Sequence, residues 1–317
     1  MPAAAAMSRE TVFLVNPASG NGATGRRWPD LHRRARELGL GGDPILSERP
    51  GQLIDLAATA AGRCGLLVVV GGDGTLNEVV NGAAGSDAEI AVIPAGTGRD
   101  FGRTYGIPTR FDDAVRVALE GATRTIDLGR AEFARPGGVK GVRLFANAGS
   151  VGMSGAVARR ANSMSKRLGG RLTFYTALVR EFLAWTNTEM TVAFDAGERT
   201  GLMHDVVVAN GRFLGGGMKL APDAQPDDGL FDVVLVGDIS KLDFALTSPK
   251  LYRGGHVGHP RVEVVQSGWV TVEADDPKLV ELDGEQEGTT PVRFEIVPRA
   301  LRIRVPGSAE PGGGGSG

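Results

Sequence analysis

Short apolar runs alternate with helical patterns along the first 125 or so residues. The apolar runs are rich in β-branched residues and predict buried strands at 11–15, 66–70 and 90–94. Apolar residues recur at helical spacing in between, which predicts helices at 26–39, 52–62 and 111–120 and a further helix that follows the glycines at 71–74. Alternating strands and helices are typical of a parallel sheet covered by helices, so we expect an α/β N-terminal domain.

The pattern changes after residue 129. A series of short strand-like runs with turn signals between them predicts a β-rich C-terminal domain, either an antiparallel sandwich-like fold or an open barrel. One helix, at about 171–186, interrupts the strands. The predicted domains are 8–128 and 129–298, with a last strand near 299–306 that returns to the first domain and flexible tails at 1–7 and 307–317.

Composition narrows the class of protein. The 35 Lys and Arg residues against 37 Asp and Glu residues give a net charge of −2, so we expect no nucleic-acid partner. The single cysteine, Cys64, excludes an internal disulfide. No apolar run approaches the roughly 20 residues that span a bilayer, and the N-terminus lacks the features of a signal peptide. We therefore expect a cytoplasmic protein, with a homodimer as the commonest assembly.

The segment GGDGTLNE at 71–78 is the strongest chemical signal. Thr75 and Glu78 have the spacing of a capping box, and a helix N-terminus presents N–H groups that suit phosphate. Asp73 would repel phosphate unless Mg²⁺ lies between them, as phosphoryl transfer requires. The alternative is a structural turn in which Asp73 only caps the helix.

Two further glycine-rich turns follow predicted strands. GNGATG at 20–25 fits a dinucleotide fingerprint, but four residues separate it from its strand, so we interpret it as a nucleotide-binding loop in which Asn16 and Ser19 contact phosphate or ribose. In AGTGRD at 95–100, Thr97 can donate to phosphate or base. Arg99 either neutralises phosphate or lies in solvent. A P-loop sequence is absent, which excludes a P-loop kinase.

Acidic residues gather in two later segments. Asp283 and Glu285, in LDGEQEG, are paired carboxylates that suit general base chemistry, although D-G turns are usually structural. The acids of PDAQPDDGLFDV at 222–233 suit either a hard cation or a solvated loop. His256 and His259 lie in a glycine-rich stretch, which favours turn or surface roles over a metal site.

Together these segments resemble the diacylglycerol kinase catalytic family, in its soluble bacterial lipid kinase branch. The matching motifs are VNPASGNG, VVVGGDGTLNEVVNG, IPAGTGRDFGRTYGIP, APDAQPDDGLFDV and LDGE, and they span about residues 10–305 in family order. GGDGT alone is shared with NAD kinases and related phosphofructokinases, whereas the combination is more specific to lipid kinases.

The resemblance implies roles for particular residues. Asp283 or Glu285 would be the general base, and Asp73 and Asp127 would organise Mg²⁺ near the phosphates. A second, structural Mg²⁺ would be held by Gln225, Asp228 and Leu230, with backbone oxygens from the first and last. The ATP-binding residues would further include Asn16, Pro17, Ala18, Ser19, Gly20, Ser47, Gly71, Gly72, Gly74, Thr75, Leu76, Asn77, Gly96 and Thr97.

The chain departs from the family at two positions. Arg99 stands where the family usually has Asn, and Asn21 stands where some relatives carry a basic residue. The charge of the phosphates is therefore expected to be neutralised from a different position.

The family places its lipid site in the cleft between the domains, and we expect the active site there. The apolar helix at 171–186 follows a basic cluster, which is the pattern of a surface that docks on an anionic membrane. An ordinary core helix with solvated basic neighbours is the alternative. The cluster consists of Arg159, Arg160, Lys166, Arg167 and Arg171.

The resulting hypothesis is an ATP- and Mg²⁺-dependent kinase that phosphorylates a lipid hydroxyl at the inner face of the membrane. Diacylglycerol is the expected acceptor and phosphatidic acid the expected product. A soluble acceptor such as NAD is the first alternative. A lipid- or nucleotide-binding regulator without turnover is the second, and it is disfavoured because binding alone needs no base.

Overall fold

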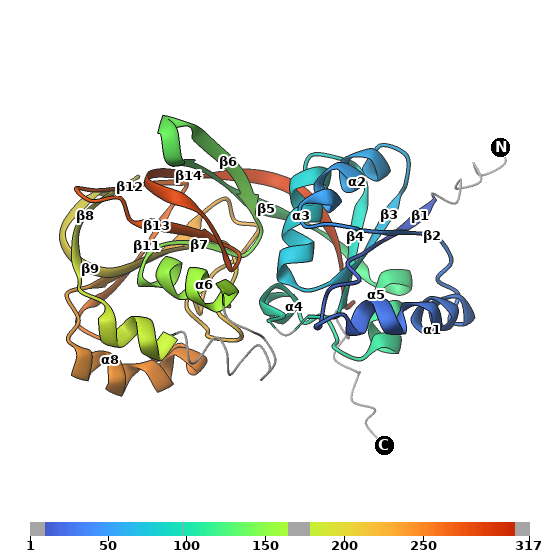
Figure 1. The fold of residues 1–317 in the computed structure, drawn as a ribbon, viewed down its shortest axis with the longest axis horizontal. Coiled ribbons are helices and arrows are strands. Elements are labelled where there is room, and N and C mark those ends of the chain that lie inside the picture. The colour runs from blue at the N-terminus through green and yellow to red at the C-terminus, as the bar shows by residue number, and fades with distance from the viewer. Residues whose placement is uncertain (1–9, 97, 164–177, 308–317) are drawn as a thin grey trace, which may run out of the picture.

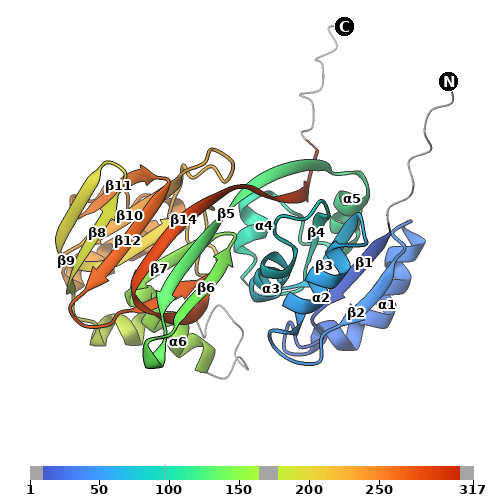
Figure 2. The same cartoon turned by 90° about the horizontal axis from the view of Figure 1, so that it is seen from above.

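The computed structural model describes residues 10–96, 98–163 and 178–307, of which 161–163 are described by their backbone alone. Two lobes lie side by side and are joined by two long strands, β5 (Ala122–Ala134) and β14 (Glu285–Val305) (Figures 1 and 2). Thr97 and most of the predicted helix at 171–186 lie outside the described residues. Residues 178–184 of that helix are helical.

The N-terminal lobe is a parallel sheet with helices on both faces. Its strands are in the order β2-β1-β3-β4, and the end of β14 pairs with β4 in parallel. Helices α2 and α3 cover one face of the sheet, and α1 and α5 cover the other (Figure 1). The bounds are β1 Thr11–Val15, α1 Ala23–Glu37, β2 Asp43–Leu46, α2 Gln52–Ala61, β3 Leu66–Gly71, α3 Asp73–Ala83, β4 Glu89–Pro94, α4 Asp100–Thr104 and α5 Phe111–Glu120.

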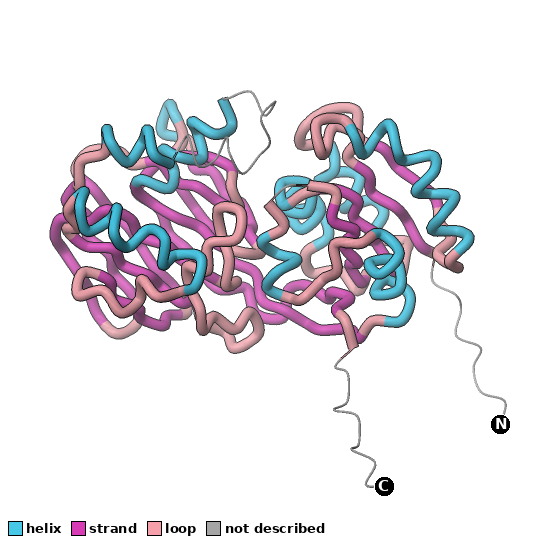
Figure 3. The backbone as a smooth tube through the Cα atoms, turned by 90° about the horizontal axis from the view of Figure 1, so that it is seen from below, coloured by secondary structure: helices cyan, strands magenta, loops and turns pink. Residues whose placement is uncertain are grey.

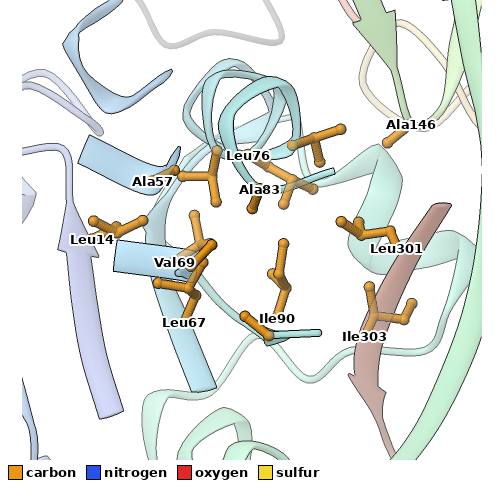
Figure 4. Packing of buried hydrophobic residues seen from close by; sticks show 14 of the residues in the cluster. Leu14, Ala57, Leu67, Val69, Leu76, Ala83, Ile90, Ala146, Leu301 and Ile303 are labelled. Carbon is orange, nitrogen blue, oxygen red and sulfur yellow. The ribbon is translucent and has the colours of Figure 1, made fainter. Parts of the chain in front are cut away.

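Alternation along the strands builds the two cores of this lobe. Phe13 packs with α1 and α5, whereas its neighbour Leu14 packs with α2 and α3, because successive side chains of a strand point to opposite faces. Figure 4 shows the second of these cores, in which Leu301 and Ile303 from the end of β14 meet Ile90 and Leu76. The last strand of the chain therefore helps to bury the core of the first lobe.

The C-terminal lobe is built on antiparallel strands that close on themselves. Six strands pair in a closed ring. The pairs are β9–β7, β7–β13, β13–β14, β14–β12, β12–β8 and β8–β9. The ring confirms the antiparallel β-rich domain that the sequence predicted, and it makes this domain a closed six-stranded barrel. The bounds are β6 Lys140–Phe145, β7 Ala148–Gly152, β8 Thr188–Phe194, β9 Gly197–Ala209, β10 Phe231–Gly237, β11 Val262–Ser267, β12 Trp269–Ala274 and β13 Leu279–Leu282.

Helices gather on one side of the C-terminal lobe. They are α6 (Met153–Ser163), the turn of helix at 178–184, α8 (Lys241–Thr247) and the 3₁₀ segment Ser248–Arg253 (Figure 1). A shorter 3₁₀ turn, Pro136–Gly138, joins β5 to β6. In the part of the chain that the structure describes, no helix is long and apolar enough to cross a membrane.

A single sheet of 14 strands runs through both lobes, and β5 and β14 carry it from one to the other (Figure 3). The two strands pair antiparallel over most of their length, with a register shift between Val297 and Leu301. Arg299 has a positive φ of 52° at this point, so the ribbon bends where it passes between the lobes. The predicted boundaries at 128 and 298 thus fall inside two continuous strands.

Candidate active site

The three glycine-rich turns meet at the carboxyl edge of the parallel sheet. The side chain of Asn16, after β1, donates to the hydroxyl of Thr75 in α3 over 3.0 Å. Gly72 and Gly96 touch backbone to backbone, because a Cβ on Gly96 would lie 2.5 Å from the Cα of Gly72. Only glycine allows this approach. The turns therefore form one continuous surface that carries backbone N–H groups.

This surface is one wall of a large cleft between the lobes, with a volume of about 910 Å³. The other wall comes from the C-terminal lobe, from the turn after β13 and from the segment around Leu214. Most of the predicted ATP and catalytic residues line the cleft. They are Asn16, Pro17, Ala18, Ser19, Gly20, Ser47, Gly72, Asp73, Gly74, Thr75, Leu76, Gly96, Asp283 and Glu285.

Asp73 begins α3 and faces the third glycine turn. The N–H groups of Phe101 and Arg99 donate to its carboxylate. Burial, together with the nearby charges of Asp100 and Asp283, raises the pKa of Asp73 to about 7. Such crowding of carboxylates is relieved by a cation, so the chemistry of this position suits Mg²⁺.

The carboxylate of Asp73 lies where a side chain at position 98 would be, so glycine is needed there. A Cβ at Gly98 would lie 2.2 Å from Oδ2 of Asp73, so Gly98→Ala is expected to displace this carboxylate and to lower the kcat of the kinase reaction predicted from the sequence at least tenfold. Gly41→Ala is the control, because a Cβ there would meet nothing within 4 Å. Steady-state kinetics of both variants test the role of Asp73. Equal kcat values would contradict it.

Asp283 occupies a tight turn with a positive φ of 49°. One oxygen accepts from the side chain of Asn77 and the N–H of Ala146, each over 2.9 Å. The other accepts from the N–H groups of Asn147 and Ala148 over 2.9 and 3.1 Å. Burial raises the pKa of Asp283, whereas these donors favour its carboxylate form. Asp283 thus ties the turn after β13 to α3 and to the segment that precedes β7.

Glu285 lies two residues farther on, at the start of β14, and is exposed to the cleft. Its Oε1 is 3.6 Å from the position that a Cβ on Gly74 would take, so the carboxylate faces the N-terminal turn of α3. Of the two acids that the sequence proposed as the general base, Glu285 therefore has the more accessible carboxylate. Asp283 is largely occupied by its N–H donors.

Asn77 connects the lobes. Its Oδ1 accepts from Nε and Nη2 of Arg143 over 3.0 and 2.8 Å, and its Nδ2 donates to Asp283 and to the carbonyl of Leu144. Gly71 and Asn77 are not among the described residues that line the cleft. The structure gives Asn77 a position from which it orients other residues of the site.

Asp127 lies in β5 and is also not among the described residues lining the cleft. Its two carboxylate oxygens accept from the N–H groups of Gly229 and Arg299 over 2.8 and 2.7 Å. These contacts hold the 222–230 loop against the bend in β14. The expected role of Asp127 beside the phosphates gains no support from this placement.

The predicted structural Mg²⁺ site lies in the 222–230 loop, outside the cleft. Oδ1 of Asp228 accepts from the N–H of Leu230 over 3.0 Å, and the negative charge of Asp228 adds to burial in raising the pKa of Asp232. No group of three or more His, Cys, Asp or Glu side chains in the described ranges is arranged to hold a metal ion. Metal binding by Gln225, Asp228 and Leu230 stays a prediction that relies on backbone oxygens.

Sequence reasoning missed several residues of the cleft. Arg49 and Arg143 line it and bring positive charge, whereas Arg99 turns away and donates through Nε to the carbonyl of Gly96 over 3.0 Å. Asp100 is also in the wall and pairs with Arg103 over 2.7 Å. No local motif marks Arg143, because β6 brings it to the site from the second lobe.

A second, apolar cavity of about 100 Å³ opens inside the C-terminal lobe. The cavity and the cleft adjoin, because some residues line both of them: Ala158, Leu214, Gly215 and Gly284. Most of the lining of the cavity is aliphatic or aromatic, and it comes from α6, the strands β9, β10 and β11, the helices around 178–184 and 241–253, and the loops next to β10: Met153, Val157, Leu178, Val207, Met218, Leu220, Val234, Val236, Ile239, Phe244, Leu251 and Val262.

Two carboxyl groups border the apolar cavity. Ser150 donates to Glu281 over 2.6 Å, and Ser154 donates to Asp205. Burial raises the pKa of Glu281 to about 8 and that of Asp205 to about 7. Both groups therefore hold protons in the folded protein at pH values where the unfolded chain has released them.

This difference predicts a pH-dependent stability. Between the ordinary pKa of 4.5 and about 8, folding requires Glu281 to retain a proton that the unfolded chain has lost, so stability falls as pH rises. Glu281→Gln is expected to stabilise the protein by roughly 1–3 kcal/mol at pH 8.5 and little at pH 4.5. Chemical denaturation at both pH values measures this difference. Glu189→Gln, at an exposed position, is the control. An equal effect of Glu281→Gln at the two pH values would refute the explanation.

The comparisons with known proteins agree with this architecture. Residues 10–131 match the diacylglycerol kinase catalytic domain, and residues 147–305 match the YegS C-terminal NAD kinase beta sandwich-like domain. A diacylglycerol kinase from Mycobacterium tuberculosis is 30% identical over 301 residues, which cover 92% of this chain and 94% of the relative. One from Bacillus subtilis is 28% identical over 300 residues, or 93% and 95% of the two chains.

Solved structures share the fold over nearly the whole chain. A crystal structure of a diacylglycerol kinase from Bacillus anthracis has a TM-score of 0.69 and 19% identity, and the match covers 94% of this chain and 97% of that one. Yeast NADH kinase in complex with NADH has a TM-score of 0.57 and 11% identity, over 95% and 84% of the two chains. The fold class and the resemblance predicted from the sequence are confirmed, and the chain belongs to the diacylglycerol kinase family.

Proposed function

We propose that this chain transfers the γ-phosphoryl group of ATP, with Mg²⁺, to the hydroxyl of a lipid, and that diacylglycerol is phosphorylated to phosphatidic acid. The observation that carries the proposal is the contact between a polar, glycine-walled cleft and an apolar cavity. A phosphate donor suits the first space, and part of an alkyl chain suits the second. Their shared wall lies beside the acidic turn at 283–285.

The polar cleft suits the phosphates of ATP. The turns after β1, β3 and β4 offer backbone N–H groups and the N-terminus of α3. Arg49 and Arg143 would neutralise the charge of the phosphates. They would thus replace the basic residue that some relatives carry at the position of Asn21. Asp73 would hold Mg²⁺ together with phosphate and water oxygens, since no three described side chains form a cage. When bound, the metal would neutralise the negative charge that develops on the phosphates.

The protein's part in the chemistry is positioning and one proton transfer. The lipid hydroxyl oxygen attacks the γ-phosphorus, the bond from that phosphorus to the oxygen of ADP breaks, and the hydroxyl proton passes to Glu285. Asp283 acts as a positioning residue that fixes the turn on which Glu285 stands. Exposure of Glu285 to the cleft and the engagement of Asp283 by N–H donors support this division.

A lipid acceptor must reach the cavity from a membrane, and α8 offers a suitable surface. Leu242 and Leu246 are 70% and 66% exposed, and Leu183 on the neighbouring helical turn is 61% exposed. Lys250 and Arg253 follow on the same side of the lobe and are exposed. An exposed apolar group with basic neighbours favours an anionic membrane surface. Of the basic cluster expected to dock there, Lys166, Arg167 and Arg171 lie outside the described residues.

The α8 surface predicts a binding defect. Replacing Leu242 and Leu246 together by Asp is expected to reduce binding to phosphatidylglycerol-containing vesicles about tenfold or more, because two exposed apolar contacts become two charges. Vesicle co-sedimentation measures this effect, with ATP affinity as the control for folding. Unchanged sedimentation would show that the protein contacts the membrane through another surface.

The alternatives are a soluble acceptor and a regulator without turnover. The shared fold of yeast NADH kinase keeps the first open, but the cavity lining is apolar and includes no described Lys or Arg, which disfavours the phosphates of a dinucleotide. The acids Asp73 and Glu285 in the cleft disfavour the second, because binding alone needs neither.

The test is phosphate transfer from labelled Mg·ATP in mixed micelles, with diacylglycerol, other lipids and soluble NAD as acceptors. Labelled phosphatidic acid is the expected product. Labelled NAD would establish the soluble acceptor instead. ATP binding without transfer to any acceptor would favour the regulator.

A further inference from the structure

Strand β6 brings Arg143 to the cleft from the second lobe, and it has a strand partner on one side only. Among the described strands, β6 pairs with β5 alone. The backbone groups along its other edge therefore need partners of another kind. At Leu144 these partners are side chains of α3, a helix of the first lobe. The side chain of Leu144 also packs against the core of that lobe, so the two lobes meet at this residue.

Asn81 of α3 binds both backbone groups of Leu144. Its Oδ1 accepts from the N–H of Leu144 over 2.8 Å, and its Nδ2 donates to the carbonyl of the same residue over 2.9 Å. A neighbouring antiparallel strand would bind the edge of β6 through the same pair of bonds. Nδ2 of Asn77, one turn earlier in α3, donates to that carbonyl as well, over 3.0 Å. The two asparagines thus take the place of a strand.

The amide of Asn81 is fixed on its own helix. Its Nδ2 also donates to the backbone carbonyl of Asn77 over 2.8 Å. Because a backbone N–H only donates and a carbonyl only accepts, these contacts leave one orientation for the amide. Asn81 is half-buried and is not among the described residues that line the cleft. Any effect of Asn81 on the chemistry must therefore pass through other residues.

Leu144 lies between two parts of the site. Arg143 precedes it and donates from Nε and Nη2 to Oδ1 of Asn77 over 3.0 and 2.8 Å. Ala146 follows two residues later, and its N–H donates to the carboxylate of Asp283 over 2.9 Å. The contact at Leu144 therefore holds both the arginine of the cleft wall and the segment that binds the acidic turn.

We propose that Asn81 is a positioning residue that holds β6 against α3 and so sets the placement of Arg143 and of the acidic turn at 283–285 relative to the glycine turn before α3. The inference goes beyond the proposed function, and only its kinetic test rests on that function. An amide is required because it donates and accepts at the end of one short side chain, whereas a carboxylate only accepts and an aliphatic group does neither. A displacement of about 1 Å near the reacting groups can cost about 10²-fold in rate.

Asn81→Leu tests the effect on turnover. Leucine has a similar shape but can make neither bond to Leu144, and it is the better helix former, so α3 itself is not weakened. The kcat for lipid phosphorylation is expected to fall at least about tenfold, while the Kd for ATP changes less than about threefold. If Asn81→Leu does not fold, Asn81→Ala replaces it.

Thr59→Leu is the matched control. It removes a hydrogen bond of 2.9 Å from the Thr59 hydroxyl to the carbonyl of Asp55, which lies within α2 and does not join the lobes. Its kcat is expected to stay within about twofold of the wild-type value. A loss in Thr59→Leu as large as in Asn81→Leu would overturn the inference, because any lost helix-surface hydrogen bond would then have the same effect.

A double-mutant cycle tests whether Asn81 acts through Arg143. Residues that act as one unit lose activity together, so their losses do not multiply. The kcat of the double variant with Asn81→Leu and Arg143→Met is expected to be at least about threefold higher than the two single losses would give if they multiplied. Losses that multiply would overturn the inference, because Asn81 would then act independently of the arginine.

Hydrogen exchange of the backbone amides tests the structural part without any turnover. In Asn81→Leu the N–H of Leu144 loses its acceptor and exchanges faster. Positioning further predicts at least about tenfold faster exchange at Ala146, Asn147 and Ala148, whose N–H groups bind Asp283, because their segment is no longer held. Faster exchange at Leu144 alone would reveal a purely local bond and would overturn the inference.

The outcomes separate this inference from the proposed function. A wild-type kcat in Asn81→Leu overturns the inference while lipid kinase activity stands. If the wild-type protein phosphorylates no acceptor, the proposed function fails, and hydrogen exchange then decides. Fast exchange that spreads from Leu144 to residues 146–148 supports the positioning role, and fast exchange confined to Leu144 overturns it.

Discussion

Replacing Glu285 by glutamine is expected to lower kcat by a factor of about 10²–10⁴, the range for loss of a general base. The glutamine keeps the size of the side chain but cannot take the hydroxyl proton. The Kd for ATP should change less than about threefold, because the phosphates would bind to the glycine turns and to arginines. Steady-state kinetics with a lipid acceptor and equilibrium ATP binding together measure the effect.

Glu295→Gln is the matched control, since Glu295 lies in the same strand but outside the cleft lining. A Glu285→Gln variant with wild-type kcat would contradict the assignment. If Asp283→Asn abolished turnover in that case and remained folded, the base would be Asp283.

Asp283→Ala is expected to lower the free energy of unfolding by about 3–5 kcal/mol, because each buried hydrogen-bond donor left without a partner costs about 1–3 kcal/mol. The substitution leaves four N–H donors, from Asn77, Ala146, Asn147 and Ala148, without their acceptor. Turnover should fall as well, because the turn that carries Glu285 loses its anchor. Urea denaturation with activity measured on the same samples checks both effects.

The comparison with Glu285→Gln separates the two acids. The Glu285 variant should retain wild-type stability, whereas Asp283→Ala should lose stability and activity together. An inactive Asp283→Ala variant of unchanged stability would mean that Asp283 acts on the substrate and has no anchoring role.

The features that were predictable from the sequence depend on local pattern. The glycines at 72 and 96 come just after apolar strand runs, and parallel strands bring their carboxyl ends to one edge. The residues after those strands therefore had to meet, and the structure places them in one cleft. The antiparallel class of the second domain followed from its short alternating runs.

The features that the sequence did not reveal depend on distant contacts. Arg143 reaches the cleft from β6, and no spacing in its own segment marks it. Asp127 fits the predicted family pattern, but its carboxylate oxygens accept hydrogen bonds from the N–H of Gly229 and from the N–H of Arg299 at the bend of β14. Both donors are more than 100 residues away in the chain. His256 lies among glycines that suggest a surface loop, but its ring is packed into the cavity. Burial of this kind depends on tertiary packing.

Mass spectrometry of products formed from Mg·ATP and a total bacterial lipid extract tests the central claim most directly, because no acceptor is chosen in advance. The account predicts a lipid heavier by one phosphate group, with phosphatidic acid among the products of the wild-type protein and not of Glu285→Gln. An extract that stays unchanged although the protein binds ATP would contradict it.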